Sequence, residues 1–255
     1  MKILCLHGMG TSGRIFEAQL TRITRQLKAD GHELVFVDGL MDCEPTNDIK
    51  LIYPPKYLAY YPIAYPHYVE DAQEYVLDII EDEGPFDGVM GFSQGAALAA
   101  SLILEQRKRN SLEDLFKFAI FICATLPFNQ DDRSGLQSWE QAKSGAKLVI
   151  GEFAGEIEAQ KPLGFPEELK EVILGRYHPE KTPGAKVPIP TVHVIGKSDA
   201  YAMQSRLLAS MCDNAQKTII EHQDDHRMPR DPRMNDQIAK SVAVMIDRVR
   251  FAAGG

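Results

Sequence analysis

The stretch GPFDGVMGFSQGAALAASLIL, residues 84–104, holds an apolar strand, a sharp turn and a helix in direct succession. Within it, Gly91-Phe92-Ser93-Gln94-Gly95 fits the pattern Gly-x-Ser-x-Gly at the junction of strand and helix. In that context the serine occupies a strained turn that raises its hydroxyl above the sheet, and the flanking glycines let neighbouring backbone come close. We therefore predict that Ser93 is a nucleophile; a purely structural serine is the alternative.

Strand and helix signals alternate on both sides of this segment. Short apolar or β-branched runs predict strands at 3–6, 34–37, 88–92, 118–122, 191–195 and 218–221. Helical spacing of apolar residues predicts helices at 14–29, 68–82, 95–109 and 235–251. Strands that are apolar throughout and alternate with helices are typical of a parallel sheet with both faces covered. The pattern predicts an α/β fold with a mostly parallel sheet and helices on both faces.

The chain has 255 residues, 44% of them apolar, which suits a single domain spanning 1–255. Two long segments interrupt the alternation of strands and helices. Residues 39–67 are rich in proline and tyrosine, and residues 127–189 contain the only tryptophan, Trp139. Connections of this length in a compact domain are more often functional than plain linkers. We interpret both as lid or pocket-wall insertions, with ordinary edge packing as the alternative for the tyrosine-rich one.

Charge and cysteine content exclude several classes of partner. The formal net charge of −8 and the lack of dense Lys/Arg runs argue against binding to nucleic acid or to an anionic membrane. The four cysteines lack the spacing of a metal site or a disulfide framework, so we interpret them as small apolar residues and expect no metal. The N-terminus enters a short strand and a glycine turn instead of a signal peptide, which favours a cytoplasmic protein.

A nucleophilic serine needs a general base and an acid that orients the base, and in this kind of fold they follow in the order Ser, Asp, His. Asp199 lies in the turn that ends the run 191–195. The segment EHQDDHRMP, 221–229, follows the last predicted strand and offers His222 and His226. We predict that His226 is the base, because it lies far enough past the strand for a loop to carry its imidazole over the serine. His222 continues the strand and is expected to be packed.

The N-terminal stretch LHGMGTSG, residues 6–13, contains Gly8-x-Gly10-x-x-Gly13. This is the glycine spacing of a dinucleotide-binding turn, and Asp38 ends the second predicted strand as a ribose-binding acid would. That alternative leaves the predicted serine, acid and histidine unexplained. An acyl-transfer site instead needs two backbone N–H donors for its oxyanion, one of them from the residue after the nucleophile. We predict that Met9 and Gln94 supply them.

Taken together, LHGMGTSG, GPFDGVMGFSQGAAL (84–98), IGKSD (195–199) and HRMP (226–229) resemble the α/β-hydrolases known as the family of serine hydrolases. The resemblance extends over nearly the whole chain. It implies an α/β-hydrolase fold, a catalytic triad of Ser93, Asp199 and His226, and an oxyanion hole formed by Met9 and Gln94. It implies no metal and no organic cofactor.

One feature of this chain departs from that family. Many members carry Gly-Gly immediately before the catalytic histidine, whereas Asp224 and Asp225 precede His226 here. A carboxylate close to an imidazole favours its protonated form. We therefore expect the two aspartates to favour protonation of the base if their side chains face it, and to have little effect if they point into water.

The segment IYPPKYLAYYP, 52–62, resembles the fungal stand-alone thioesterases that release polyketide chains from the acyl carrier protein of a synthase. The resemblance implies a serine hydrolase that cleaves a thioester or ester of a medium or large acyl group. A general carboxylesterase acting on small esters is the alternative, followed by a non-hydrolytic cyclase or binding protein on the same fold. The expected substrate contacts are Gly8, Gly10, Tyr60, Tyr61 and Trp139.

Overall fold

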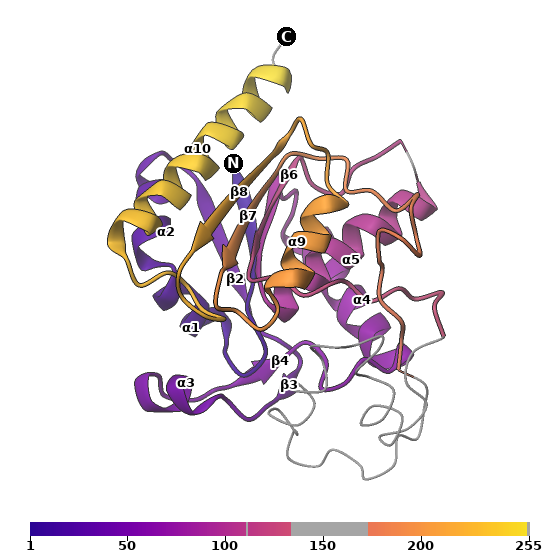
Figure 1. Cartoon of the computed structure of the whole chain (residues 1–255), viewed down its shortest axis with the longest axis horizontal. Helices are drawn as coiled ribbons and strands as arrows, with labels where there is room; N and C mark the ends of the chain where they lie inside the picture. The colour runs from indigo at the N-terminus through magenta and orange to yellow at the C-terminus, as the bar shows by residue number, and fades with distance from the viewer. Residues whose placement is uncertain (111, 134–172, 254–255) are drawn as a thin grey trace.

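A six-stranded parallel sheet forms the centre of the structure, a computed structural model that describes residues 1–110, 112–133 and 173–253 (Figure 1). The strand order is β2-β1-β5-β6-β7-β8, and every neighbouring pair is parallel. Their bounds are β1 Lys2–Leu6, β2 Glu33–Val37, β5 Gly88–Phe92, β6 Phe118–Ile122, β7 Thr191–Gly196 and β8 Lys217–His222. All six predicted strands are confirmed to within one residue at each end.

Helices cover both faces of this sheet (Figure 1). One face carries α1 Gly13–Gln19, α2 Thr21–Ala29 and α10 Pro232–Ala253, and the other carries α4 Pro66–Glu83, α5 Gln94–Arg109 and α9 Ala202–Ser210. The predicted arrangement of a mostly parallel sheet between two helical layers is therefore confirmed. None of the helices within the described ranges has a stretch long and apolar enough to cross a membrane. The expected cytoplasmic location stays a prediction.

The continuous apolar character of the strands follows from this two-sided burial. Along β1, Leu4 and Leu6 pack into the core beneath α4 and α5, whereas Ile3 and Cys5 pack into the core beneath α2 and α10. Successive side chains of a strand point to opposite faces, so a strand buried on both sides must be apolar at every position. Burying one such side chain contributes about 1.5–3 kcal/mol. This burial anchors the strands whose carboxyl ends carry the predicted site.

Two details of the helices differ from the sequence prediction. The predicted helix at 14–29 is two helices, α1 and α2, which meet at the buried residue Leu20. Leu20 leaves helical geometry with φ −92° and ψ 4°, although its apolar spacing continues the pattern of both helices. Helix α9 and the short helix α3 Asn47–Ile52 were not predicted from the sequence.

The first insertion lies at the carboxyl edge of the main sheet (Figure 1). It contains a small antiparallel pair, β3 Met41–Asp42 and β4 Leu58–Ala59, and the short helix α3 Asn47–Ile52. An isolated bridge between Thr11 and Leu58 joins this insertion to the loop after β1. Residues 127–133 and 173–189 of the second insertion are described, whereas Trp139 lies outside the described residues. The assignment of one domain, and of lid roles to both insertions, stays a prediction.

Candidate active site

Ser93 occupies the turn between β5 and α5 in a conformation that non-glycine residues rarely adopt. Its φ is +50° and its ψ is −112°. Such geometry costs free energy and persists only where the surrounding structure holds it. Here the Ser93 N–H donates to the carbonyl of Ile122 at 2.9 Å, and its own carbonyl accepts the N–H of Ala97 at 3.0 Å. Bonds to β6 on one side and to α5 on the other therefore maintain the strained turn.

Close packing of α5 against β1 and β5 explains the glycines on either side of Ser93. A Cβ atom on Gly95 would lie 2.5 Å from the His7 carbonyl oxygen and would also collide with the carbonyl of Leu6. A Cβ atom on Gly91 would lie 2.5 Å from Ala96 Cα. Because these obstacles are backbone atoms, they cannot move aside cheaply. The motif therefore requires glycine at both positions for steric reasons.

The structure brings Ser93, His226 and Asp199 into one chain of hydrogen bonds. His226 Nε2 lies 2.8 Å from Ser93 Oγ, and His226 Nδ1 lies 2.9 Å from Asp199 Oδ2. The Asp199 side chain is fully buried, and its other oxygen accepts the N–H of Tyr201 at 2.7 Å. A carboxylate facing Nδ1 keeps the proton on that nitrogen and leaves Nε2 free to accept the serine proton. The arrangement suits nucleophilic catalysis by the serine.

The loops that carry the acid and the histidine interlock. A Cβ atom on Gly196 would lie 2.5 Å from the Asp225 carbonyl oxygen and 2.7 Å from that of Asp224. Ser198 donates its N–H to the Asp224 carbonyl at 3.3 Å and its hydroxyl to the Gln223 carbonyl at 3.1 Å. The backbone after β8 therefore rests directly on the turn after β7. This contact sets how far the imidazole reaches toward the serine.

The carboxylates of Asp224 and Asp225 bond to groups other than the His226 imidazole. Asp225 binds the Arg227 guanidinium through both oxygens, and this pairing lowers the pKa of Asp225. Asp224 Oδ2 accepts the N–H of Arg230 at 3.1 Å and lies 3.6 Å from Nδ1 of His222, a buried histidine whose pKa is lowered by burial. The contacts thus give no support to the expectation that the two aspartates favour protonation of the base.

Two backbone N–H groups next to Ser93 have no hydrogen-bond partner among the described residues. They belong to Met9 and Gln94, the two predicted oxyanion donors. A Cβ atom on Gly8 would lie 3.4 Å from Ser93 Cβ, which places the loop after β1 against the nucleophile. Gln94 is the first residue of α5, where the N-terminal end of the helix favours negative charge. Both donors can therefore serve an anion that forms beside Ser93.

Two other polar groups of the loop after β1 bond within the protein. The Gly8 carbonyl accepts the hydroxyl of Thr11 at 2.7 Å, and the Gly10 N–H donates to the Leu58 carbonyl at 2.9 Å. Gly10 has a φ of +73°, which explains the preference for glycine there. These bonds give no support to Gly8 and Gly10 as polar contacts to substrate. Neither bond involves the Met9 N–H, which has no partner among the described residues.

The glycine spacing of this loop does not create a dinucleotide site. Asp38, which would bind a ribose in that alternative, accepts the N–H of Gly13 at 2.9 Å. Gly13 is the first residue of α1, so the carboxylate caps the positive end of that helix. The group expected to recognise a cofactor is therefore occupied inside the protein.

His7 holds the loop after β1 in place, a role that the sequence analysis did not identify. Its Nε2 accepts the N–H of Gly39 at 2.8 Å, so the proton of the neutral ring lies on Nδ1, which is 2.8 Å from the Gly8 carbonyl. His7 is fully buried, and this burial lowers its pKa, which keeps the ring neutral. The only signal in the sequence was a histidine placed directly before the first glycine.

The two tyrosines predicted to contact substrate lie in the interior. Tyr60 is 1% exposed; its hydroxyl accepts the N–H of His7 at 3.2 Å and donates to the Val37 carbonyl at 3.0 Å. These bonds make Tyr60 part of the scaffold and give no support to its prediction as an acyl contact. Tyr61 packs edge-on against Phe128, with ring centroids 5.9 Å apart. Its contact with substrate, like that of Trp139, stays a prediction.

Cys123 lies close to Asp199 and His226. It follows β6 with a φ of +45°, and its sulfur lies within 4.8 Å of ligand atoms of Asp199 and His226. Among the described residues this is the one group with the composition of a metal site. The carboxylate and imidazole already bind each other, however, and burial raises the pKa of the thiol well above its usual range. The thiol instead lies 3.6 Å from the carbonyl of Arg227 and supports the histidine loop.

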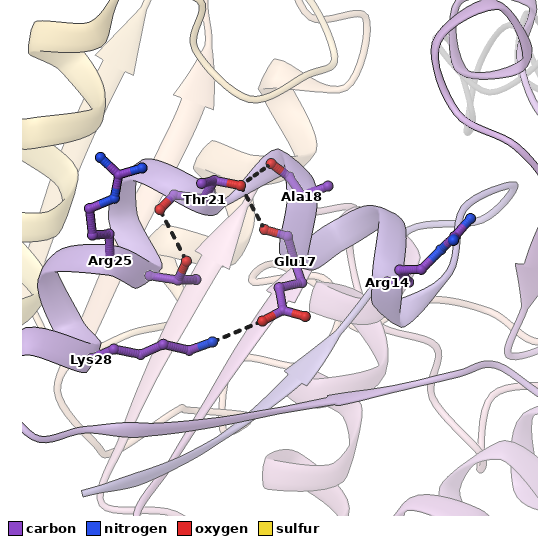
Figure 2. A pocket seen from close by; sticks show the side chains of 7 residues that line it. Arg14, Glu17, Ala18, Thr21, Arg25 and Lys28 are labelled. Atoms are coloured by element: carbon purple, nitrogen blue, oxygen red, sulfur yellow. Dashed lines mark hydrogen bonds and ion pairs between the residues drawn. The ribbon is translucent and has the colours of Figure 1, made fainter.

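A cavity of about 520 Å³ opens elsewhere, on the outer side of α1 and α2 (Figure 2). Arg14, Arg25 and Lys28 line it together with Glu17, which pairs with Lys28 at 2.8 Å. None of the predicted site residues lines this cavity. It is therefore separate from the arrangement around Ser93.

The sequence matches the serine hydrolase (FSH1) family over residues 1–238. The chain belongs to this family. It is 32% identical to "Esterase FPY3" of Fusarium mangiferae over 254 residues, which cover 97% of this chain and 98% of that protein. It is 31% identical to "Hydrolase FUB4" of Fusarium oxysporum f. sp. lycopersici over 274 aligned positions, with 98% of each chain covered. The protein is a serine hydrolase that acts on ester bonds.

Solved structures support the fold of this serine hydrolase. The mouse alpha/beta hydrolase domain-containing protein 10 aligns with a TM-score of 0.56 and 16% identity, over 97% of this chain and 90% of that chain. At this identity the likeness concerns the fold alone. Together with the six-stranded parallel sheet, it confirms the predicted α/β-hydrolase fold.

Replacing Ser93 by alanine should abolish nearly all turnover of the hydrolase. Triad members act as a unit, so only binding and the oxyanion donors would remain, and these accelerate the reaction with water by about 10³–10⁴-fold. The measurement is steady-state hydrolysis of a p-nitrophenyl ester together with labelling by a fluorophosphonate probe. Ser210→Ala, at the exposed end of α9, is the matched control and should keep both signals. Near-normal activity of Ser93→Ala would contradict its assignment as nucleophile.

Replacing Gly196 by alanine should damage catalysis through geometry. The added methyl group would strike the carbonyl of Asp225 and push the histidine loop away from Ser93. A displacement of about 1 Å costs on the order of 10²-fold in rate. Gly184→Ala is the control, because a Cβ atom there would meet nothing within 4 Å. Comparison of kcat and of melting temperature for the two variants tests the idea, and equal kcat values would refute it.

Proposed function

We propose that the protein hydrolyses the thioester or ester of a medium or large acyl group through an acyl-enzyme formed on Ser93. The observation that carries this proposal is the juxtaposition of two arrangements. One is the hydrogen-bonded chain from Ser93 through His226 to Asp199, and the other is the pair of N–H groups of Met9 and Gln94 without partners among the described residues. The first activates a nucleophile and the second stabilises the anion that its attack creates.

In the first half of the reaction, Ser93 Oγ attacks the acyl carbonyl while its proton passes to His226 Nε2. Asp199 stabilises the imidazolium through the 2.9 Å contact with Nδ1. The carbonyl oxygen becomes an oxyanion that accepts the N–H groups of Met9 and Gln94. When the tetrahedral intermediate collapses, His226 returns the proton to the departing thiol or alcohol. A water molecule, which gives its proton to His226 Nε2, then attacks the carbonyl of the acyl-enzyme. The acid product leaves as His226 returns the proton to Ser93 Oγ.

The physiological reaction that we propose is release of a polyketide chain from an acyl carrier protein. What supports it is the likeness of residues 52–62 to fungal thioesterases of that kind. This segment lies in the insertion at the carboxyl edge of the sheet, on the side where β5 delivers Ser93. A general carboxylesterase is the second candidate, favoured by the name "Esterase FPY3" of one relative. No cofactor takes part in either reaction as proposed.

Aromatic residues near the insertion are the proposed contacts for the acyl chain. Tyr61 and Phe128 pack edge-on and join the first insertion to the segment after β6. An apolar wall formed by these rings would contact the remote part of a long chain and would not reach a short one. Binding energy from contacts far from the reacting carbonyl can help to position that carbonyl for attack.

Replacing Tyr61 by alanine should reduce kcat/KM for long acyl esters far more than for acetyl esters. Apolar contact is worth about 0.8 kcal/mol per buried CH₂, which is roughly fourfold in rate for each CH₂ that loses its contact. A series of p-nitrophenyl esters from acetyl to decanoyl measures the effect. Tyr61→Phe keeps the ring and serves as the matched control. Equal losses along the series would indicate a folding defect and would exclude Tyr61 as an acyl contact.

Comparing three forms of one acyl group separates the two candidate reactions. The same acyl chain is offered as a carrier-protein thioester, as an N-acetylcysteamine thioester and as a p-nitrophenyl ester. A carrier-specific thioesterase should show the highest kcat/KM with the carrier-bound form. A preference for the free ester would support the general carboxylesterase instead. Absence of hydrolysis in all three, despite a folded protein, would contradict the proposed function.

A further inference from the structure

Residues 58–61 of the first insertion contact the loop that carries the Met9 N–H. The Gly10 N–H donates to the Leu58 carbonyl at 2.9 Å, and the Leu58 N–H donates to the Thr11 carbonyl at 2.6 Å. These two bonds form an antiparallel bridge that begins one residue beyond Met9. The position of the loop is thereby tied to the position of residues 58–61.

Tyr60 adds a second contact on the other side of Met9. Its hydroxyl accepts the His7 N–H at 3.2 Å, and the two rings pack with centroids 4.9 Å apart. Burial raises the pKa of Tyr60 well above its usual value, so the hydroxyl keeps the proton that it donates to the Val37 carbonyl. Met9 is therefore flanked by residues that are both fastened to the same segment.

The same segment also binds the residue that supplies the other donor. Gln94 Oε1 accepts the N–H of Tyr60 at 2.9 Å, and Gln94 Nε2 donates to the carbonyl of Tyr61 at 2.8 Å. The Gln94 side chain is buried, and its amide meets one donor and one acceptor of the backbone, which determines the orientation of the amide. The backbone N–H of this residue starts α5 beside Ser93.

We propose that residues 58–61 form a brace, a segment bonded to the residues around both oxyanion donors, which holds the two donors at a fixed separation. The Gln94 side chain is the positioning group that links this brace to the second donor. The inference rests on the proposed function, because it assigns Met9 and Gln94 as donors to an oxyanion. Movement of either donor relative to the other would break buried hydrogen bonds. The buried donors and acceptors of those bonds would then lack partners, which costs free energy. The brace thus keeps the donors in place before substrate arrives.

A fixed separation matters most in the transition state. Oxyanion donors accelerate acyl transfer because they are already aimed at the position where negative charge develops. Loosening the brace should therefore weaken binding of the transition state and leave ground-state binding of the acyl chain nearly unchanged. A loss in kcat with little change in KM is the signature of such an interaction.

The first test is Gln94→Glu, which keeps the length of the side chain and the backbone donor. The ionised carboxylate cannot donate to the Tyr61 carbonyl and places negative charge near the oxyanion, so kcat at pH 8 should fall by about 10²–10³-fold, the range for loss of one oxyanion donor. As pH falls, the neutral carboxyl regains a donor. Burial raises the pKa of a carboxyl group, so the ratio of variant to native kcat should rise as pH is lowered from 8 to 6.

The second test is Gln94→Met, which removes both hydrogen bonds. It should lower kcat by at least tenfold and weaken binding of a boronic acid that mimics the tetrahedral intermediate by a similar factor. The ratio of the kcat of Gln94→Met to that of the native protein should not depend on pH. Gln73→Met is the matched control, because Gln73 is also buried and donates to Ser101 Oγ, on the same helix α5, at 2.7 Å. This variant should lose thermal stability while keeping kcat and boronate affinity.

Two outcomes separate failure of the brace from failure of the proposed function. If the native protein neither reacts with a fluorophosphonate probe nor hydrolyses esters, the proposed function fails. If the native protein does both, but the Gln94 variants keep kcat and boronate affinity within about twofold, the brace is overturned. A Gln94→Glu ratio that stays flat with pH would likewise contradict the role assigned to the amide.

Discussion

Close packing of the first turn of α5 against β1 is the contact on which the candidate site depends. Gly95 lies so near the carbonyls of Leu6 and His7 that no other residue fits. This approach forces the chain through a sharp turn between β5 and α5, and Ser93 occupies that turn with a positive φ. The same packing places the N–H of Gln94, which has no partner within the described ranges, beside the loop after β1. One steric constraint therefore positions the nucleophile and both candidate oxyanion donors.

The remaining groups reach Ser93 because a parallel sheet delivers all its carboxyl ends to one edge. Asp199 follows β7 and His226 follows β8, and the two loops are held together by the close approach of Gly196 to the backbone at 224–225. The sulfur of Cys123, after β6, lies within 4.8 Å of ligand atoms of Asp199 and His226 and contacts the carbonyl of Arg227. Ser93 and His226 lie more than a hundred positions apart in the sequence and meet because the strand order brings the ends of their strands together.

The first insertion has a structural role in addition to any contact with substrate. Its tyrosine-rich composition suggested a wall for the acyl chain, yet Tyr60 accepts the His7 N–H at the start of the loop after β1, and the Gln94 side chain binds the peptide groups of Tyr60 and Tyr61. The insertion therefore stabilises the geometry of the site from outside the sheet.

Sequence alone was sufficient for the strands, their two-sided burial and the three side chains that the structure joins by hydrogen bonds. Those features depend on local patterns: apolar periodicity, a glycine-flanked serine at a strand end, and the order in which acid and histidine follow. It was not sufficient for the direction of Asp224 and Asp225, the partners of His7, or the burial of Tyr60. Each of these is decided by contact with a group elsewhere in the fold, because a side chain turns toward the partner that satisfies it, and only the tertiary structure brings that partner within reach.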